Sequence, residues 1–290
     1  MDHQFEIVTD STCDLPVEEL AELGVEMVPL HVFVGDSCYL DQIEIKPKEF
    51  YAKMTAAEEL PYSSQPSPSA FATAFAKLAE AGAKQVLSIH ISGALSGTAN
   101  SAALAAQDSP VPVRVWDTKI GTSMQGIYVK EACRMRDAGE SLDDTLAHLK
   151  KLREQSSLVF VLDTLENIVK NGRCSRAKGL MSAVLNIKAV LHVTDEGALE
   201  PIAKGRGMQR AYQALAKIVE AKYGAGARLT AAFATSDNEE GCKECLEAIE
   251  KRGITVDLQG TYSAGPVIST HTGIGLVAFS CVPTEMLYRD

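Results

Sequence analysis

The amino-acid sequence predicts an α/β protein with two domains: an N-terminal parallel sheet covered by helices, and a smaller C-terminal domain with a mixed sheet. Up to about residue 155, strand-like apolar runs alternate with helical patterns, an order that is typical of a parallel sheet buried on both faces. The second half instead contains two short alternating segments around Asp195-Glu196-Gly197, which predict a β-hairpin. A chain of 290 residues is long enough for two domains. We therefore assign 1–156 to the N-terminal domain and 157–290 to the C-terminal domain.

The N-terminal half carries clear signals for individual elements. Strands are expected at 5–10, 25–34, 85–91 and 113–117. Ser67 followed by Pro68 predicts the start of a helix, because serine caps helices and proline is tolerated at the first helical position. Ser141 with Asp144 three residues later resembles a capping box and predicts a second helix start.

In the C-terminal half, an apolar run and the hairpin precede alternating helices and strands. Strands are expected at 157–163, 228–235, 254–260 and 275–282, with helices near 207–222 and 238–252. The hairpin and these late strands predict the mixed sheet of the second domain.

Charge and composition exclude several classes of partner. The formal net charge of -10 leaves no basic field for nucleic acid or for an anionic membrane surface. The first sixteen residues include Asp2, Glu6, Asp10 and Asp14, unlike a signal peptide, and no apolar run reaches the length of a membrane span. We therefore expect a cytoplasmic protein without stable membrane insertion.

The seven cysteines are scattered and do not predict a disulfide framework. Cys242 and Cys245 form a lone CxxC pair on an expected helix, whereas a structural zinc site needs four ligands. We therefore expect no metal site.

Three loops that precede helices carry hydroxyl groups: Asp10-Ser11-Thr12, Ser63-Ser64-Gln65 and Ser96-Gly97-Thr98. Loops that follow parallel strands gather at the carboxyl edge of the sheet, where ligands bind. Helix N-termini at that edge offer free N–H groups and favour an anion. The three loops together predict a carboxylate or phosphate site. The alternative is that each hydroxyl only caps its own helix.

Two further residues are candidates for this site. His271 lies in a turn beside Gly273 and Gly275, which indicate a backbone that another group approaches closely. A lone histidine is more often structural. Arg206 is flanked by glycines at an expected helix start, an unusual place for an arginine that is only solvated.

Motifs of hydrolases and nucleotide-binding enzymes are incomplete. A nucleophile elbow around Ser96 requires glycine at positions 94 and 98, which are Ala94 and Thr98 here. Gly205-Arg206-Gly207 is followed by Arg210 where a dinucleotide fingerprint needs its third glycine. Without a candidate base or a metal cluster, we expect no catalytic residues and no cofactor.

Five motifs in order along the chain resemble the DegV family. They are "VTDSTCDLP" (8–16), "SSQPSP" (63–68), "SGALSGTANSA" (92–102), "LDTLENIVKNGRCS" (162–175) and "HTGIG" (271–275). The resemblance implies two α/β domains and an apolar tunnel that holds one long-chain fatty acid. It also implies the role of the fatty-acid-binding subunit of bacterial fatty acid kinase, which presents the carboxylate to a separate ATP-dependent kinase for acyl phosphate formation.

The resemblance also implies roles for individual residues. The positions matched to the carboxylate site are Ser63, Ser96, Gly97, Thr98, His271 and Arg206. Gly172-Arg173 matches a loop at the kinase-facing rim, and we expect Arg173 to be exposed and to bind the partner. Three positions depart from the family pattern: Ser63 replaces threonine, Ile274 replaces proline, and Ala99 stands where an aromatic residue is frequent.

Two other functions remain as alternatives to this non-catalytic subunit. A serine esterase or acyltransferase would use Ser96 and His271 as nucleophile and base. A lipid-sensing regulatory protein would bind the same ligand and act on another partner.

Overall fold

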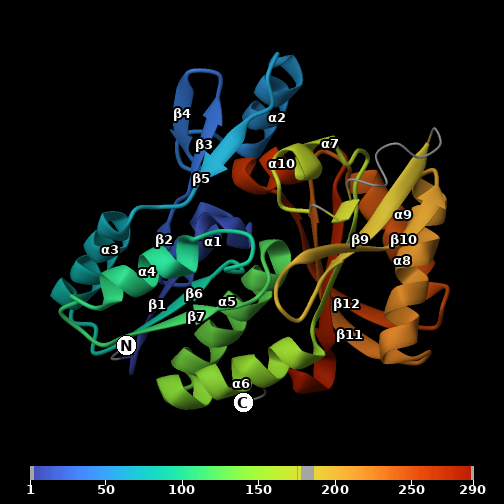
Figure 1. Cartoon of the computed structure of the whole chain (residues 1–290). Helices are drawn as coiled ribbons and strands as arrows, with labels where there is room; N and C mark the ends of the chain where they lie inside the picture. Colours follow the sequence, from blue (N-terminus) through green and yellow to red (C-terminus); the bar gives the residue numbers. More distant parts are fainter. Residues whose placement is uncertain (1–2, 175, 178–185, 289–290) are drawn as a thin grey trace.

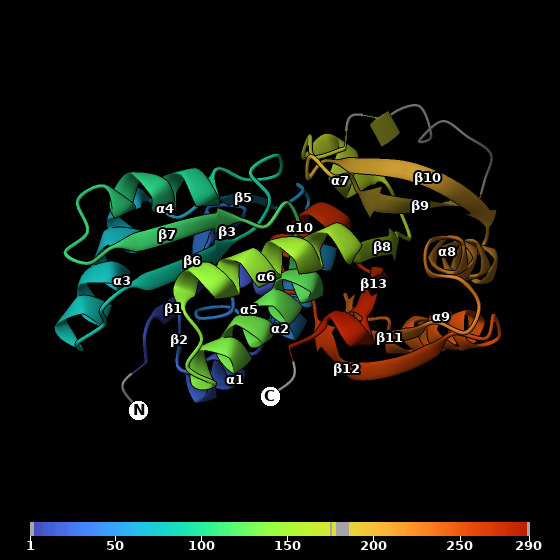
Figure 2. The same cartoon turned by 90° about the horizontal axis from the view of Figure 1, so that it is seen from below.

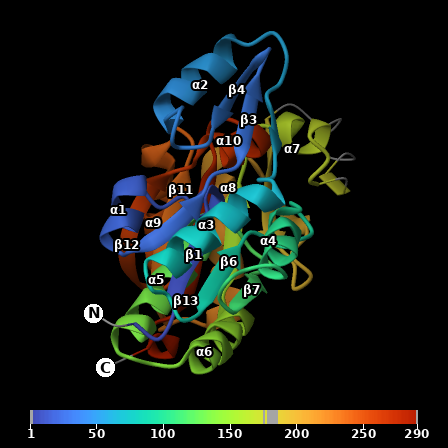
Figure 3. The ribbon, with the colours of Figure 1, turned by 90° about the vertical axis from the view of Figure 1, so that its left-hand side faces the viewer.

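The computed structural model describes residues 3–174, 176–177 and 186–288, which form three sheets flanked by helices (Figure 1). None of the helices in these residues is long and apolar enough to cross a membrane. Figure 3 shows that the small sheet with β3 and β4 lies at the opposite end of the molecule from both chain termini.

The N-terminal sheet is fully parallel, as predicted from the alternation of strands and helices. Its strands lie in the order β2 (Val25–Val28), β1 (Glu6–Asp10), β6 (Val86–His90) and β7 (Val113–Asp117). The helices around it are α1 (Val17–Glu22), α3 (Pro68–Glu80), α4 (Thr98–Ala106) and α5 (Thr122–Asp137). Successive residues of a strand point to opposite faces of the sheet. Val8 of β1 therefore packs with α3 and α4 on one face, whereas Ile7 packs with α5 on the other.

The prediction of one strand at 25–34 is wrong, because the chain changes sheet within this run. Pro29 follows β2, and β3 (His31–Val34) leaves the parallel sheet to pair with two other short strands. Proline cannot donate a hydrogen bond to a neighbouring strand, so the ladder breaks there. The resulting antiparallel sheet also contains β4 (Ser37–Leu40) and β5 (Tyr62–Ser64), and it lies next to α2 (Pro47–Ala56) (Figure 1).

The C-terminal sheet is mixed, as predicted, and has six strands although this half of the chain is the shorter one. Its order is β10 (Leu199–Arg206), β9 (Ile187–Val193), β8 (Ser157–Val161), β13 (Val277–Pro283), β11 (Arg228–Thr235) and β12 (Thr255–Ser263). Only the β11–β12 pair is parallel among these described strands. The predicted hairpin is confirmed as β9–β10, with Gly197 at φ 85° in its turn.

Helices α3 and α6 (Leu142–Gln155) begin where their capping serines predict. Ser67 accepts a hydrogen bond from the Ala70 N–H at the start of α3, and Ser141 accepts one from the Asp144 N–H. The remaining helices are α7 (Glu166–Lys170), α8 (Met208–Tyr223), α9 (Glu239–Glu250), α10 (Pro266–Thr272) and the 3-10 turns η1 (Ser11–Cys13) and η3 (Thr284–Met286).

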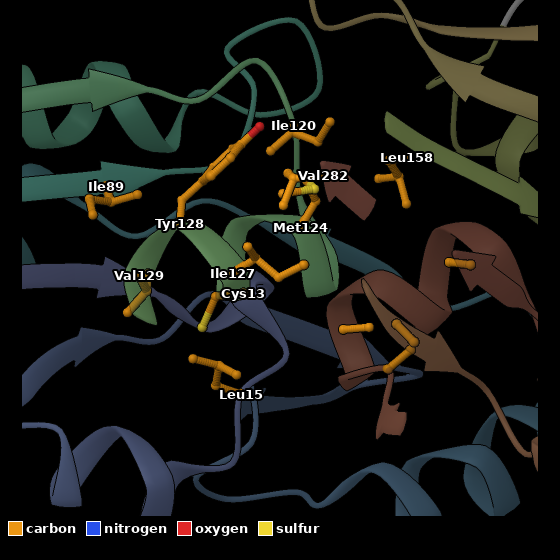
Figure 4. Close-up of a cluster of buried hydrophobic side chains, with 14 of the residues drawn as sticks. Cys13, Leu15, Ile89, Ile120, Met124, Ile127, Tyr128, Val129, Leu158 and Val282 are labelled. Atoms are coloured by element: carbon orange, nitrogen blue, oxygen red, sulfur yellow. The ribbon is translucent and has the colours of Figure 1, made fainter. Parts of the chain in front are cut away.

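One buried cluster joins the two halves of the chain through α5. Figure 4 shows Met124 and Tyr128 of α5 among Ile89 of β6 and Leu158 of β8. Seen from below, α5 and α6 lie between the parallel strands and the C-terminal sheet (Figure 2). The opposite face of the C-terminal sheet packs against α8 and α9. Residues of both halves also line a cavity next to this shared core.

Candidate functional site

A cavity of about 270 Å³ lies where β5, the loop before α4, the segment after α7 and α10 come together. We call it the outer chamber. It is lined by Leu30, Ser63, Ser64, Gln65, Ile91, Leu95, Ser96, Ile168, Arg173, Leu199, Val267, Ile268, His271 and Thr272. Three of the six residues predicted for the carboxylate site therefore meet here from distant parts of the sequence: Ser63, Ser96 and His271. The chamber combines hydroxyl, amide and guanidinium groups with aliphatic side chains.

A second cavity of about 60 Å³, the inner chamber, adjoins the first. The two chambers share five lining residues, Ile91, Leu95, Leu199, Ile268 and Thr272. The inner chamber adds side chains from the inner face of the C-terminal sheet, among them Leu158 and Phe160. Its lining is almost wholly apolar, so the site has one polar end and one apolar end.

Ser63 and His271 form the central polar contact of the outer chamber. Ser63 lies on β5 and pairs with Val32, which directs both side chains toward α10. The Ser63 Oγ lies 2.8 Å from His271 Nε2. Burial and, to a smaller extent, the nearby Arg173 guanidinium together lower the pKa of His271 to about 3. The imidazole is therefore neutral near pH 7, and its Nδ1 is buried without a hydrogen-bond partner in the described structure.

Ser96 does not cap a helix. The N-cap of α4 is Gly97, and no side-chain hydrogen bond caps this helix start. The Ser96 Oγ lies 2.9 Å from the Thr98 Oγ1 at the edge of the outer chamber. The alternative in which each hydroxyl only caps its own helix is therefore wrong for Ser96, and the first N–H groups of α4 carry no side-chain cap.

The close approach at Gly97 depends on its missing side chain. A Cβ at this position would lie 2.5 Å from the Gln65 Oε1. Gln65 lines the outer chamber together with Ser63 and Ser64, which directly precede it in the sequence. Sequence reasoning missed Gln65 as a lining residue, although its place directly after these two serines was a usable signal.

The third hydroxyl loop does not reach the cavity. Ser11 and Thr12 are fully buried, and their hydroxyls donate to Asp41 and Asp10. Of the three loops expected at one ligand-binding edge, only those with Ser63 and Ser96 line the outer chamber.

The expectation that Arg173 is exposed is wrong. Its side chain is half-buried in the wall of the outer chamber, where it donates to the Leu95 and Asn171 carbonyl oxygens. Burial lowers the pKa of the guanidinium from its usual value. No ion pair involves Arg173 within residues 3–174, 176–177 and 186–288, so the site has a cation available for an anionic ligand.

Arg206 is not part of this cavity. It is exposed at the last position of β10, whereas the chambers are lined by Leu199 at the first position of that strand. Seven residues of extended chain span about 23 Å. The glycines beside Arg206 serve a local purpose instead, since Gly205 packs directly against the backbone of α8 at Ala211.

The geometry that an esterase would need is not formed by the expected pair. His271 contacts Ser63 rather than Ser96, and no carboxylate orients its Nδ1 in the described residues. A Ser–His–Asp chain does occur elsewhere: Ser88 Oγ lies 2.6 Å from His90 Nε2, and His90 Nδ1 lies 2.9 Å from Asp10 Oδ2. All three side chains are completely buried beneath α3, so no substrate reaches them.

A larger groove of about 940 Å³ lies between α8 and α9 on the far side of the C-terminal sheet. It is lined mainly by charged and amide side chains, including Glu220, Glu240, Glu244, Glu247, Lys251 and Arg252. Because an apolar ligand gains little against such a surface, the two adjoining chambers are the better candidate site.

The amino-acid sequence is similar to a family model and to known proteins over nearly its whole length. The family model described as "Uncharacterised protein, DegV family" matches residues 4–284. A DegV domain-containing protein of Deinococcus radiodurans is 37% identical over 280 residues, which cover 96% of this chain and 98% of the relative. A DegV domain-containing protein of Listeria innocua is 34% identical over 289 residues, which cover 99% of both chains.

Solved structures show the same similarity in three dimensions. A DegV family protein from Thermus thermophilus, described with fatty acid binding, has a TM-score of 0.90 and 36% identity, covering 97% of this chain and 99% of the other. DegV of Bacillus subtilis, described as a fatty acid binding protein, has a TM-score of 0.85 and 27% identity, covering 97% and 100%.

Proposed function

This chain belongs to the DegV family, and from that premise we propose that it binds one long-chain fatty acid in the two adjoining chambers. The observation that carries the proposal is that a polar chamber adjoins an apolar one, with five lining residues in common. Relatives of the same fold are described as fatty acid binding proteins, which supports the same ligand class here.

The carboxylate of the fatty acid is proposed to occupy the outer chamber. Desolvating an ionised carboxylate is costly unless hydrogen bonds replace its water. The Ser96 hydroxyl lines this chamber and is a suitable donor. The N–H groups at the start of α4 follow Ser96 directly, carry no side-chain cap and are proposed as further donors. Arg173, in the same wall, supplies a positive charge, the part that we had expected from Arg206.

His271 is proposed to orient the Ser63 hydroxyl rather than to ionise. Because the ring is neutral, one of its nitrogens carries a proton and the other does not. If Nε2–H donates to the Ser63 Oγ, the Ser63 proton is free to donate to the carboxylate. This tautomer makes Ser63 a donor toward the ligand without placing a second cation beside Arg173.

The acyl tail is proposed to run into the inner chamber toward Leu158 and Phe160. Each buried methylene contributes about 0.8 kcal/mol, so the tail supplies most of the affinity. The side chains that separate the chambers, such as Leu95, Leu199 and Ile268, are aliphatic and have several rotamers. Their rotation would join the two volumes into one tunnel.

We further propose that the protein does not catalyse by itself but presents the carboxylate to an ATP-dependent fatty acid kinase. Among the described residues that line its polar end there is no group suited to transfer a phosphoryl group, whereas the hydroxyls and the cation there suit a bound carboxylate. Arg173 at this end remains our predicted contact for the kinase, in addition to its place in the chamber wall.

The test combines lipid identification with a coupled reaction. Native mass spectrometry of the purified protein, followed by organic extraction, should identify one fatty acid per chain. Delipidated protein resupplied with hexadecanoic acid should then yield acyl phosphate when a fatty acid kinase subunit and ATP are added. Bound lipid without acyl phosphate would favour a lipid-sensing role, and hydrolysis of an ester or acyl thioester by the protein alone would contradict the non-catalytic proposal.

A further inference from the structure

Helix α10 forms one wall of the outer chamber and carries His271. Two carboxyl groups from the N-terminal part of the chain accept hydrogen bonds from its start. The Gly265 N–H donates to the Asp14 Oδ1 at 2.8 Å, and the Val267 N–H donates to the Asp41 Oδ1 at 3.3 Å. Asp14 and Asp41 are 2% and 0% exposed, so both contacts are removed from solvent. The orientation of α10 therefore depends on residues that are more than 200 positions away in the sequence.

The second oxygen of each carboxyl group is held by a hydroxyl from another element. Thr122 Oγ1 donates to the Asp14 Oδ2 at 2.5 Å, and Ser11 Oγ donates to the Asp41 Oδ2 at 2.6 Å. Burial raises the pKa of Asp14 to about 8 and that of Asp41 to about 7. Burying these groups is costly, and the hydrogen bonds that each one makes offset part of this cost.

The same network touches the walls of both chambers. Thr122 lines the inner chamber beside Gly121. Leu30 lines the outer chamber, and its N–H donates to the Ser11 Oγ at 3.1 Å. The two carboxyl groups thus link α10 to the other lining segments rather than to a remote part of the core.

Backbone strain is concentrated in this network. Gln42 belongs to it because its Nε2 donates to the Ser11 carbonyl oxygen at 2.7 Å. Asp14, Gln42 and Thr122 have φ angles of 55°, 64° and 52°, and they are three of the six non-glycine residues with positive φ in the described part of the chain. This conformation is rare for a β-branched residue such as threonine. Such strain persists only where surrounding contacts impose it, and it gathers at functional sites.

We propose that Asp14 and Asp41 are positioning residues for the fatty acid headgroup: they fix the start of α10 and so hold His271 against Ser63. The step from α10 to the ligand rests on the function proposed above. His271 lies five residues after Pro266, about one and a half turns along a helix of seven residues. A short helix moves as one body, so a shift at its first turn is transmitted to the imidazole. Because α10 also contributes Ile268 and Thr272 to the inner chamber, its shift affects burial of the tail as well, but misplacing the imidazole weakens carboxylate binding more.

The test is the ratio of two dissociation constants, that of hexadecan-1-ol over that of hexadecanoic acid, measured on delipidated protein. The alcohol keeps the tail and lacks the carboxylate, so general destabilisation lowers both affinities and leaves the ratio unchanged. Asp14→Ala and Asp41→Ala each remove one acceptor for an α10 N–H. Asp14→Asn keeps an oxygen that can accept from Gly265 and serves as the conservative rescue.

A milder variant and a matched control complete the set. A Cβ at Gly265 would lie 3.1 Å from the Asp14 Oδ1 and 3.3 Å from the Asp41 Oδ1, so Gly265→Ala displaces the network without removing any polar group. Ser141→Ala removes the cap of α6, far from the chambers, and lowers stability without touching α10.

We expect Asp14→Ala and Asp41→Ala to lower the ratio at least fivefold, Gly265→Ala to lower it less, and Asp14→Asn and Ser141→Ala to leave it within twofold. A folded Asp14→Ala with the wild-type ratio overturns the proposal. If both alanine variants fail to fold, an unchanged ratio in Gly265→Ala overturns it instead. The His271 ring resonances, followed by NMR in the same variants without ligand, should shift in Gly265→Ala and not in Ser141→Ala. A wild-type ratio near one with shifted His271 resonances would reject the proposed ligand site while supporting the positioning role.

Discussion

Replacement of Ser96 by alanine separates a ligand-binding hydroxyl from a structural one. In the structure the Ser96 Oγ has one described partner, the Thr98 hydroxyl 2.9 Å away, and it does not cap α4. Thr98 is fully buried, so its hydroxyl loses a partner when Ser96 becomes alanine. This loss should cost about 1 kcal/mol of the free energy of unfolding.

The effect on fatty acid affinity should be larger. A hydrogen bond to a charged group contributes about 1.5–3 kcal/mol, and each 1.4 kcal/mol corresponds to a tenfold change in the dissociation constant. The dissociation constant for hexadecanoic acid should therefore rise about ten- to a hundredfold. Binding should survive, because the tail contributes about 0.8 kcal/mol for each buried methylene.

Ser67→Ala is the matched control for this prediction. Ser67 caps α3 by accepting from the Ala70 N–H and does not line either chamber, so its removal should also cost about 1 kcal/mol of stability. The assay is fluorescence displacement or calorimetry for the dissociation constant, with urea unfolding of the same delipidated preparations. We expect equal losses of stability in the two variants and a loss of affinity only in Ser96→Ala. Equal affinity in both variants would show that Ser96 has no contact with the carboxylate.

Three further predictions concern the same site. Hexadecanoic acid at a hundred times its Kd should stabilise the delipidated protein by about 2.7 kcal/mol and raise the Tm by several degrees in calorimetry, whereas an unchanged Tm across a panel of acids would contradict a fatty acid site. Arg173→Glu should weaken binding of hexadecanoic acid at least tenfold and leave the affinity for hexadecan-1-ol unchanged. It should also lower the rate of acyl phosphate formation by the kinase at saturating hexadecanoic acid. An equal loss of affinity for the acid and the alcohol would indicate that the arginine is purely structural. The pKa of His271 is lowered to about 3 in the folded protein, below the value of about 6.5 for a free imidazole. Between these two values the unfolded chain binds a proton that the folded chain does not. The free energy of unfolding is therefore highest above pH 6.5 and falls as the pH decreases toward 3. His271→Gln should therefore flatten the decline of the unfolding free energy between pH 6.5 and pH 4.5 in urea titrations, and an unchanged decline would place the titration elsewhere.

Local signals in the sequence were sufficient to predict most of the helices and strands. The alternation of apolar runs and helical patterns predicted the parallel sheet, and Ser67 and Ser141 marked two helix starts that the structure confirms. The turn around Gly197 predicted the β9–β10 hairpin. These features depend on backbone preferences and on patterns only a few residues long, which are written directly in the sequence.

The run at 25–34 shows where such a pattern misleads. Its apolar residues are continuous, but Pro29 ends the ladder of β2, and the following residues pair with β4 and β5. The proline was a readable signal. The strands with which β3 pairs could not be predicted in this way, because strand pairing depends on how whole elements pack together and not on the sequence of one strand.

The candidate site also has some features that the sequence predicted and others that only the tertiary structure shows. The motifs around Ser63, Ser96 and His271 identified three lining residues, and the family resemblance related them to a carboxylate. Only the tertiary structure decided that His271 contacts Ser63, 208 residues away, that Arg173 rather than Arg206 supplies the nearby charge, and that Asp14 holds the start of α10. The sequence by itself determined which residue types stand in each loop and where the strands and helices begin. The distances between loops from different sheets follow from how the two halves pack around α5, and no short stretch of sequence contains that information.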